Sequence, residues 1–305
     1  MRRFYLRYKI CFPMLTLFSI PKAFDGHIGV IQRNALQSWL ALRPHCEIVL
    51  CGDDRGTKAV AREFGVEHIP YIARNSYGTP LVNSAFELVE RMASYPLLCC
   101  VNADIIFVDG LTAAIQALSS AEFLLLGRRW DVDISDAINF TEEKWRSDIK
   151  KRIAKHGLLH PPTGIDYFLF SKGISWEFPA FAVGRPGWDN WLIYRARQLG
   201  VTVVDASHAV TVVHQNHDYA HVKEATDHTT EGPEADRNRE LTGGWGHIFT
   251  INDATHFLQP GAGAAYVLKR NLATLPVSLL RPLKQINFLC GAGCRVIRRR
   301  FSAGV

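Results

Sequence analysis

The sequence LLCCVNADIIFVD, residues 97–109, decides the fold expected for this chain. It places a short apolar run on each side of Asn102-Ala-Asp104. Apolar runs of this length predict a fully buried strand of a parallel sheet. A carboxylate is costly to bury without a partner, so we expect Asp104 where the strand leaves the sheet, facing a cation or a ligand. The alternative is an Asx-turn, in which Asn102 or Asp104 bonds to its own backbone.

Strand and helix patterns alternate on the N-terminal side of this stretch. Strand-like runs cover residues 15–20, 47–51 and 66–69, and helical spacing of apolar residues separates them. This alternation predicts an α/β fold with a mainly parallel sheet, right-handed crossovers and helices on both faces. Ligands of such sheets bind at the carboxyl ends of the strands. Asp53 and Asp54 follow the second strand, so they are expected near Asp104.

The pattern continues less regularly toward the C-terminus. Further strands are expected at residues 123–126, 166–170, 201–204 and 210–213, with a helix beginning near Trp188. Three regions are predicted: a main α/β domain over residues 1–217, a polar flexible loop or lid over 218–260, and a basic helical extension over 261–305. The extension is expected either to pack on the body or to lie on a membrane surface.

Composition limits the classes of protein that fit. The 305 residues are 48% apolar, and no apolar run reaches the ~18 residues of a membrane span. The net charge of +6 suits anionic partners such as nucleotide phosphates, acidic lipids or nucleic acid, although no aromatic-basic interleaving marks a nucleic-acid channel. The seven cysteines form no CxxC pair, which is typical of buried thiols in a reducing compartment. We therefore expect a cytoplasmic protein, with peripheral contact at the inner face of the membrane as an open alternative.

Two phosphate-binding motifs are missing. No GxGxxG follows the first strand, where Pro21-Lys-Ala-Phe24 stands, and GxxxxGK[ST] occurs nowhere in the chain. This argues against a dinucleotide oxidoreductase and a P-loop ATPase. If phosphates bind, a metal rather than a glycine loop is expected to hold them.

The order of these features resembles the GT-A glycosyltransferase fold of nucleotide-diphospho-sugar transferases, over roughly residues 13–217. The resemblance is carried by a first strand without a glycine loop, an acidic pair after the second strand, a DxD-like triplet after the fourth, and an acidic residue at a helix start followed by a histidine at a later strand end. It implies that Asp53 or Asp54 contacts the nucleotide base.

The resemblance also implies a divalent metal, Mn²⁺ or Mg²⁺, bound by Asp104 and holding the diphosphate of the donor. Asn102 stands where the family more often has aspartate. Manganese also accepts imidazole, so His214 is expected to be a further ligand, with His217 and His221 as alternatives.

Further site residues are expected around this centre. Asp189 stands at a helix start, where inverting family members place the general base; the alternative is a first-turn aspartate stabilised by the helix dipole. Arg128 and Arg129 are candidates for contact with the diphosphate. Asp131-Val-Asp133 is a literal DxD and a rival to the earlier triplet, with the acceptor side or a turn as its expected place.

The resemblance implies a glycosyltransferase that moves a sugar from a nucleotide-diphosphate sugar to a hydroxyl of a glycan, a lipid carrier or a small molecule. Two alternatives remain. One is a non-catalytic binding protein with the same fold. The other is a sugar-1-phosphate nucleotidyltransferase, although the glycine-rich signature of that class is absent here.

Overall fold

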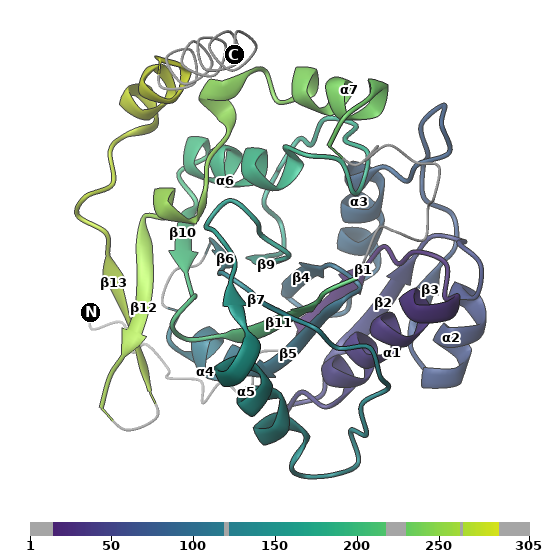
Figure 1. Cartoon of the computed structure of the whole chain (residues 1–305). Helices are drawn as coiled ribbons and strands as arrows, with labels where there is room; N and C mark the ends of the chain where they lie inside the picture. Colours follow the sequence, from purple (N-terminus) through teal and green to yellow (C-terminus); the bar gives the residue numbers. More distant parts are fainter. Residues whose placement is uncertain (1–14, 119–121, 218–229, 263–264, 287–305) are drawn as a thin grey trace, which may run out of the picture.

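A computed structural model describes residues 15–118, 122–217, 230–262 and 265–286, and its centre is a nine-stranded sheet (Figure 1). In spatial order its strands are β13 (Tyr266–Arg270), β12 (His256–Pro260), β10 (Thr202–Asp205), β6 (Phe123–Leu126), β9 (Tyr167–Ser171), β4 (Leu97–Val101), β1 (Leu15–Ser19), β2 (Glu47–Cys51) and β3 (Glu67–Ile69). Strands β1 to β4 run parallel, whereas β9 is antiparallel to both of its neighbours. The expected α/β class with a mainly parallel sheet is confirmed.

A second sheet of four strands corrects one expectation. It has the order β5 (Ile105–Asp109), β11 (Thr211–Gln215), β7 (Trp130–Val132) and β8 (Leu158–Leu159). The two apolar runs around Asn102 were expected to form one strand of the main sheet, and this is wrong. The chain turns at residues 102–104, where the amide of Ile105 donates to the carbonyl of Asn102 at 3.1 Å, and β5 pairs antiparallel with β11. Asp104 is therefore at the junction of the two sheets.

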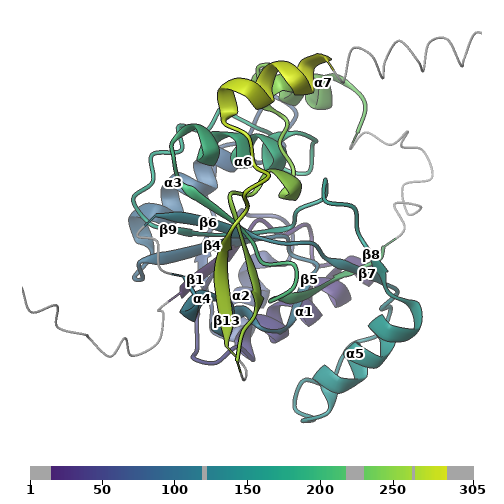
Figure 2. The same cartoon turned by 90° about the vertical axis from the view of Figure 1, so that its left-hand side faces the viewer.

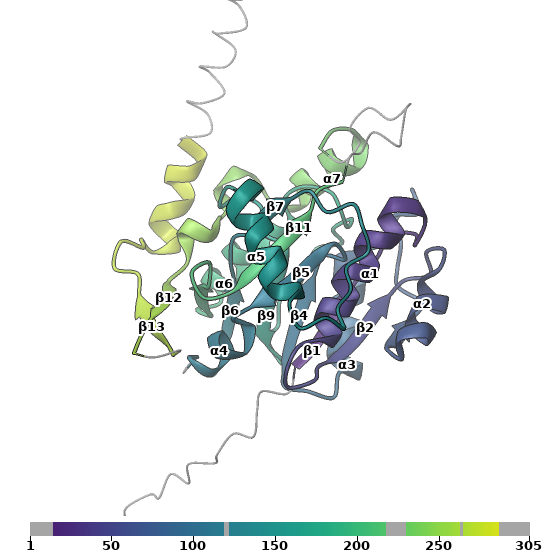
Figure 3. The same ribbon diagram turned by 60° about the horizontal axis from the view of Figure 1, so that its bottom comes forward.

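Helices cover both faces of the main sheet. The helices α3 (Val82–Met92) and α6 (Trp188–Gln198) pack on one face, and α1 (Gly26–Leu40), α2 (Thr57–Phe64) and α4 (Leu111–Gln116) pack on the other. Strand β5 also lies on this second face, with Ile105 and Phe107 turned toward the main sheet and Ile106 and Val108 turned toward α5 (Trp145–His156). Figure 3 shows α1 and α5 on the same side of the sheets.

The polar region 218–260 was expected to be a flexible loop or lid, and its described residues, 230–260, form several regular elements. It contains α7 (Pro233–Leu241), the 3-10 turns η2 (Trp245–His247) and η3 (Ile251–Asp253), and strand β12. Proline at the first turn and two acidic residues there suit a helix start. Glu234 accepts hydrogen bonds from Asn75 and Arg185, each at 2.6 Å, and buried Asn238 bonds to the backbone of Ala182. Polar tertiary contacts therefore fix a helix that has little apolar periodicity.

The C-terminal region differs from a purely helical extension. Strand β13 pairs with β12 as an edge hairpin, and residues 277–286 then form a helix beside α7 (Figure 2). Among the described residues, no helix is both long and apolar enough to cross a membrane. Residues 287–305, and the predicted basic run within them, lie outside the described part of the chain.

Candidate functional site

The main cavity lies at the carboxyl ends of β1, β2 and β4, where the fold predicts ligands. Its volume is about 540 Å³. Residues 20–23 line it after β1, Asp54 after β2, and residues 102–104 after β4, while α1 and residues 183–185 form further walls. Segments that are far apart in the sequence therefore share one cavity, which is called the central cavity below.

Asp104, His214 and His217 form a cluster in the central cavity. The pairing of β5 with β11 places His214 beside Ile105, and so next to Asp104. The Oδ2 atom of Asp104 lies 3.2 Å from Nε2 of His217 and 3.5 Å from Nε2 of His214. One ligand atom from each residue falls within 4.8 Å of the others. The structure thus brings together the two residues expected at a metal site and adds His217; His221 lies outside the described residues.

The donor atoms of this cluster fit a divalent cation. Oδ1 of Asp104 is buried and has no hydrogen-bond partner within the described part of the chain. Leaving a buried carboxylate oxygen unpaired is costly, which makes it a ready ligand. One carboxylate with two imidazoles suits Mn²⁺ better than Mg²⁺, because Mg²⁺ prefers oxygen ligands. The residues that would hold such an ion are Asp104, His214 and His217.

Charges within the cluster set its protonation. Burial alone would raise the pKa of Asp104, but hydrogen bonding and positive charge at His214 and His217 lower it well below its usual range. Burial opposes protonation of His214, yet the hydrogen bond and charge of Asp104 raise the pKa of this imidazole. Asp104 is therefore ionised across the neutral range, as a metal ligand must be.

The backbone of Asp104 is held by a buried polar relay. The side chain of Gln215 donates to the carbonyls of Asp104 at 3.0 Å and of Ile31 at 2.8 Å. Asn34 in α1 donates to Oε1 of Gln215 at 2.9 Å and accepts from the amide of Ile138 at 2.9 Å. Both amide side chains are almost fully buried. This relay joins α1, β11 and the turn that carries Asp104, so the position of the carboxylate is fixed by three elements.

A second acidic centre lies beside the cluster, and it adds Asp166, which sequence reasoning missed, to the expected Arg129 and Asp131. Arg129 pairs with Asp166, which precedes β9, and with Asp131 at 2.9 Å; its side chain is only 16% exposed. Asn102 also donates to Asp166, at 2.6 Å. Burial would raise the pKa of Asp131, but the hydrogen bond from His160 and the charge of Arg129 lower it. Asn102 brings an amide to this side of the cavity where an aspartate was more usual in the family, and Asp166 supplies a carboxylate beside it.

The second triplet, Asp131-Val-Asp133, lies beside the cluster of Asp104, His214 and His217. The parallel register of β11 and β7 places Asp131 beside His214, with 3.5 Å between Oδ1 and Nδ1. Asp133 instead bonds to Asn216 at 2.8 Å. Nδ1 of His214 has no hydrogen-bond partner within the described part of the chain. Asp131 therefore lies beside the imidazole without bonding to it, and both triplets have a carboxylate next to His214.

The acidic pair after β2 reaches the cavity through an arginine that sequence reasoning missed. Arg74 donates to Asp53 at 2.6 Å and to Asp54 at 3.0 Å. Arg74 and Asp54 line the cavity, whereas Asp53 is outside its lining. The hydrogen bond from Arg74 to the carbonyl of Gly78, at 2.7 Å, ties this pair to the loop before α3. This wall of the cavity therefore carries a guanidinium between two carboxylates.

Asp189 is in the first turn of α6, which begins at Trp188 directly after Gly187, whose φ of 103° favours glycine. Asp189 is not among the residues that line the cavity. Burial, together with the negative charge of Asp166, raises its pKa to about 6, although backbone N–H groups at the helix start act in the opposite sense. A carboxyl group with a pKa near neutrality has the property that a general base requires. The charge of Asp166, which lines the cavity, acts on this carboxyl group.

Arg128 and Arg129 are adjacent in the sequence, but only one of them reaches the cavity. Arg129 lines the cavity, whereas Arg128 donates to the carbonyls of His160 at 2.7 Å and of Leu159 at 3.2 Å, and lies outside the lining. Neighbouring side chains of an extended segment point in opposite directions, so only one of the pair can reach the site. Of the residues expected at the site, the structure therefore places in the lining Asp54, Asn102, Asp104, Arg129 and His214.

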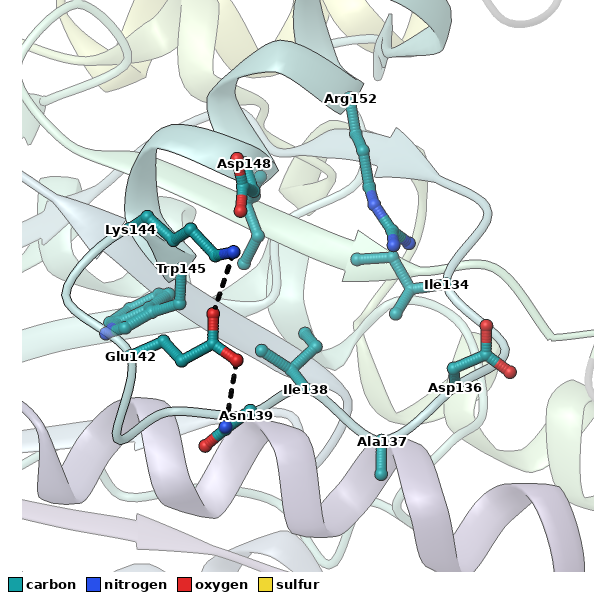
Figure 4. A pocket seen from close by; sticks show the side chains of 11 residues that line it. Ile134, Asp136, Ala137, Ile138, Asn139, Glu142, Lys144, Trp145, Asp148 and Arg152 are labelled. Atoms are coloured by element: carbon teal, nitrogen blue, oxygen red, sulfur yellow. Dashed lines mark hydrogen bonds and ion pairs between the residues drawn. The ribbon is translucent and has the colours of Figure 1, made fainter.

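A smaller cavity of about 280 Å³ lies between α5 and the segment after β7 (Figure 4). Its side chains partly satisfy one another, because Glu142 bonds to Lys144 at 3.0 Å and to Asn139 at 3.0 Å. Trp145 is buried against Phe140 and offers no open ring face. This cavity has no imidazole in its wall. Asp54, Asn102, Asp104, Arg129 and His214, which were expected at the site, line the central cavity instead.

No family model matches the chain, and no curated protein matches it. Solved structures do resemble it. Glucosyl-3-phosphoglycerate synthase of Mycobacterium tuberculosis matches 88% of this chain and 93% of its own length, with 12% identity and a TM-score of 0.46. A mannosyltransferase from Pyrobaculum calidifontis, solved with GDP-Man and Mn²⁺, matches 68% of this chain, with 10% identity and a TM-score of 0.42. This chain spans only 58% of that mannosyltransferase.

Identity and TM-score are both low. The activity and substrates of this chain are accordingly inferred from its own residues.

Proposed function

We propose that this protein is a metal-assisted glycosyltransferase that moves a sugar from a nucleotide-diphosphate donor to a hydroxyl acceptor. The observation that carries this proposal is the cluster of Asp104, His214 and His217, with one buried carboxylate oxygen unpaired, in the same cavity as Asp54 and Arg74. A divalent cation bound there would offset the negative charge that develops on a departing diphosphate. A cavity of about 540 Å³ is within the size range of small-molecule sites.

Each side chain takes one task in this proposal. Asp54 and Arg74 form the wall that receives the nucleoside, and Asp104, His214 and His217 hold the cation.

Asp189 is the proposed general base. It accepts the proton of the acceptor hydroxyl while the hydroxyl oxygen bonds to the anomeric carbon and the bond from that carbon to the diphosphate oxygen breaks. This assignment implies inversion at the anomeric carbon, and its pKa of about 6 keeps Asp189 ionised at neutral pH.

Donor consumption tests the proposal without knowledge of the acceptor. Purified protein is incubated with UDP-, GDP- and CMP-sugars and Mn²⁺, and release of the nucleotide is followed with water as the default acceptor. We expect slow release from one donor class, and a loss of at least about 100-fold in Asp104→Asn, because the cation then lacks its carboxylate ligand.

Three results would count against this function. Binding of a donor that is never consumed, even with a broad panel of acceptors, would favour a non-catalytic binding protein. Formation of a nucleotide sugar from a nucleoside triphosphate and a sugar 1-phosphate would favour a nucleotidyltransferase. Equal turnover in Asp104→Asn and wild type would remove Asp104 from the mechanism.

A further inference from the structure

The loop between β3 and α3 turns tightly at residues 75–79, beside the central cavity. The amides of Tyr77 and Thr79 both donate to Oδ1 of Asn75, at 2.9 and 3.0 Å. The amide of Asn75 donates to the carbonyl of Thr79, and the amide of Gly78 donates to the carbonyl of Asn75, each at 3.0 Å. These bonds give the turn one backbone conformation and fix the point at which Tyr77 leaves it.

Glu234 in α7 holds this turn against a second segment of the cavity wall. Its carboxylate accepts from Nδ2 of Asn75 and from the guanidinium of Arg185, each at 2.6 Å, and its side chain is only 12% exposed. Burial would raise the pKa of Glu234, but hydrogen bonds from Thr79 and Asn75 and the charge of Arg185 lower it. An ionised carboxylate makes strong hydrogen bonds of this kind. Glu234 therefore joins the turn to the segment 183–185 without lining the cavity itself.

Tyr77 is the aromatic side chain that this turn adds to the cavity. Apart from the imidazoles of His214 and His217, it is the only aromatic ring in the lining formed by the described residues. Tyr77 is nevertheless 64% exposed, and within the described part of the chain its side chain makes no hydrogen bond and no ring contact. Single exposed aromatic residues are ordinary on a protein surface. A tyrosine on a fixed turn in a cavity wall, however, offers a flat face to a ligand at a small cost in conformational entropy.

We propose that Tyr77 stacks on the nucleobase of the donor and that Glu234 is the positioning residue that holds Tyr77 there. This inference rests on the proposed function, in which Asp54 and Arg74 receive the nucleoside. Tyr77 is three residues after Arg74 and lines the same cavity. Every base has a π-face, so stacking adds affinity for any base. Selection between bases is left to the polar groups of Asp54 and Arg74.

Calorimetric titration in Mn²⁺ with UDP, GDP and CMP, and with a sugar conjugate of each, tests the contact. Tyr77→Ala is expected to bind the preferred nucleotide and its sugar conjugate about tenfold more weakly, because both carry the base. Tyr77→Phe retains the ring face and is expected to bind as the wild type does. The matched control is Tyr71→Ala, because Tyr71 lies in the same loop and is 86% exposed but does not line the cavity.

A double-mutant cycle tests the positioning role of Glu234. Glu234→Gln is expected to weaken nucleotide binding several-fold in the wild type and to have little effect in Tyr77→Ala, because Glu234 acts through Tyr77. A loss of general stability would not depend on Tyr77 in this way, and thermal melting of each variant checks that its fold is retained. The control in the same helix is Glu240→Gln, because Glu240 pairs with Arg237 on the surface.

The outcomes separate this inference from the proposed function. Equal nucleotide affinity in Tyr77→Ala and the wild type would overturn the stacking contact and leave the glycosyltransferase proposal standing. A loss confined to the sugar conjugates would also contradict it, because Tyr77 would then contact the sugar ring. Independent effects of Glu234→Gln and Tyr77→Ala would remove Glu234 as the positioning residue. Failure of the wild type to bind any of the nucleotides would overturn both proposals.

Discussion

Replacing Asp189 with asparagine is expected to lower kcat by about 10²- to 10⁴-fold, the range for loss of a general base. Asparagine keeps the shape of the side chain and an oxygen that accepts the backbone N–H groups at the start of α6, but it takes up no proton from the acceptor. In the wild type, activity is expected to rise with pH through about 6, where Asp189 loses its proton. The pH dependence of kcat/KM is the measurement.

The same variant is expected to be more stable than the wild type at neutral pH. Burial raises the pKa of Asp189 from its ordinary value near 4 to about 6, so the folded state favours the protonated form. The ionised carboxylate therefore destabilises the fold above pH 6, and this cost fades as pH falls to about 4, where the unfolded chain is also protonated. Asp189→Asn removes it, with an expected gain of about 1–3 kcal/mol at pH 8.

Urea unfolding at pH 8 and pH 4 measures this gain. A stabilised but inactive Asp189→Asn would fit a base kept at a cost in stability. Unchanged kcat would remove Asp189 from the mechanism. Unchanged stability at both pH values would contradict the raised pKa.

Arg129→Met is expected to lower the free energy of unfolding by about 3–5 kcal/mol, the effect of removing one partner of a buried ion pair. The side chain of Asp166 is only 6% exposed, and without Arg129 its remaining hydrogen bond comes from Asn102. Methionine retains the apolar length of the arginine side chain, so the change tests mainly the charge. Urea unfolding at pH 7 measures the effect.

The double variant Arg129→Met/Asp166→Asn separates charge from packing. Asparagine removes the unpaired carboxylate, so a large part of the lost stability is expected to return. A control is Arg33→Met, because Arg33 pairs with Glu63 on the surface, where about 0–1 kcal/mol is expected. A loss below about 1 kcal/mol in Arg129→Met would show that the network around Asp166 is well solvated.

Local patterns were sufficient to predict most of the main sheet and its helices. The four apolar residues of β6 form a strand with the predicted bounds, and α6 begins at the predicted Trp188. The separate strand β5 was not predictable in this way, because its partner β11 is about a hundred residues away in the sequence. Helix α7 was missed because tertiary polar contacts, rather than apolar spacing, hold it.

The candidate site was predictable where residues follow strand ends. Asp54, Asn102 and Asp104 line one cavity because parallel strands end at one edge of the sheet. His214 reaches the same cavity through the pairing of β11 with β5 in the second sheet. Arg74 was missed because it lies in a loop without periodicity. Asp166 was missed because only its long-range pairing with Arg129 distinguishes it from other residues before a strand. The one available signal for Asp166 was a charged residue directly before a run of apolar residues.

Calorimetric titration with Mn²⁺ and UDP, GDP or CMP is the most direct test of the proposed site. The wild type is expected to bind one of these nucleotides only when Mn²⁺ is present, and Asp104→Asn is expected to bind it at least about 100-fold more weakly. Asp109→Asn is the matched control, because Asp109 is at the other end of β5 and pairs with Lys150 outside the cavity; it should behave as the wild type. Nucleotide binding of equal strength without metal, or in Asp104→Asn, would contradict a cation site at Asp104.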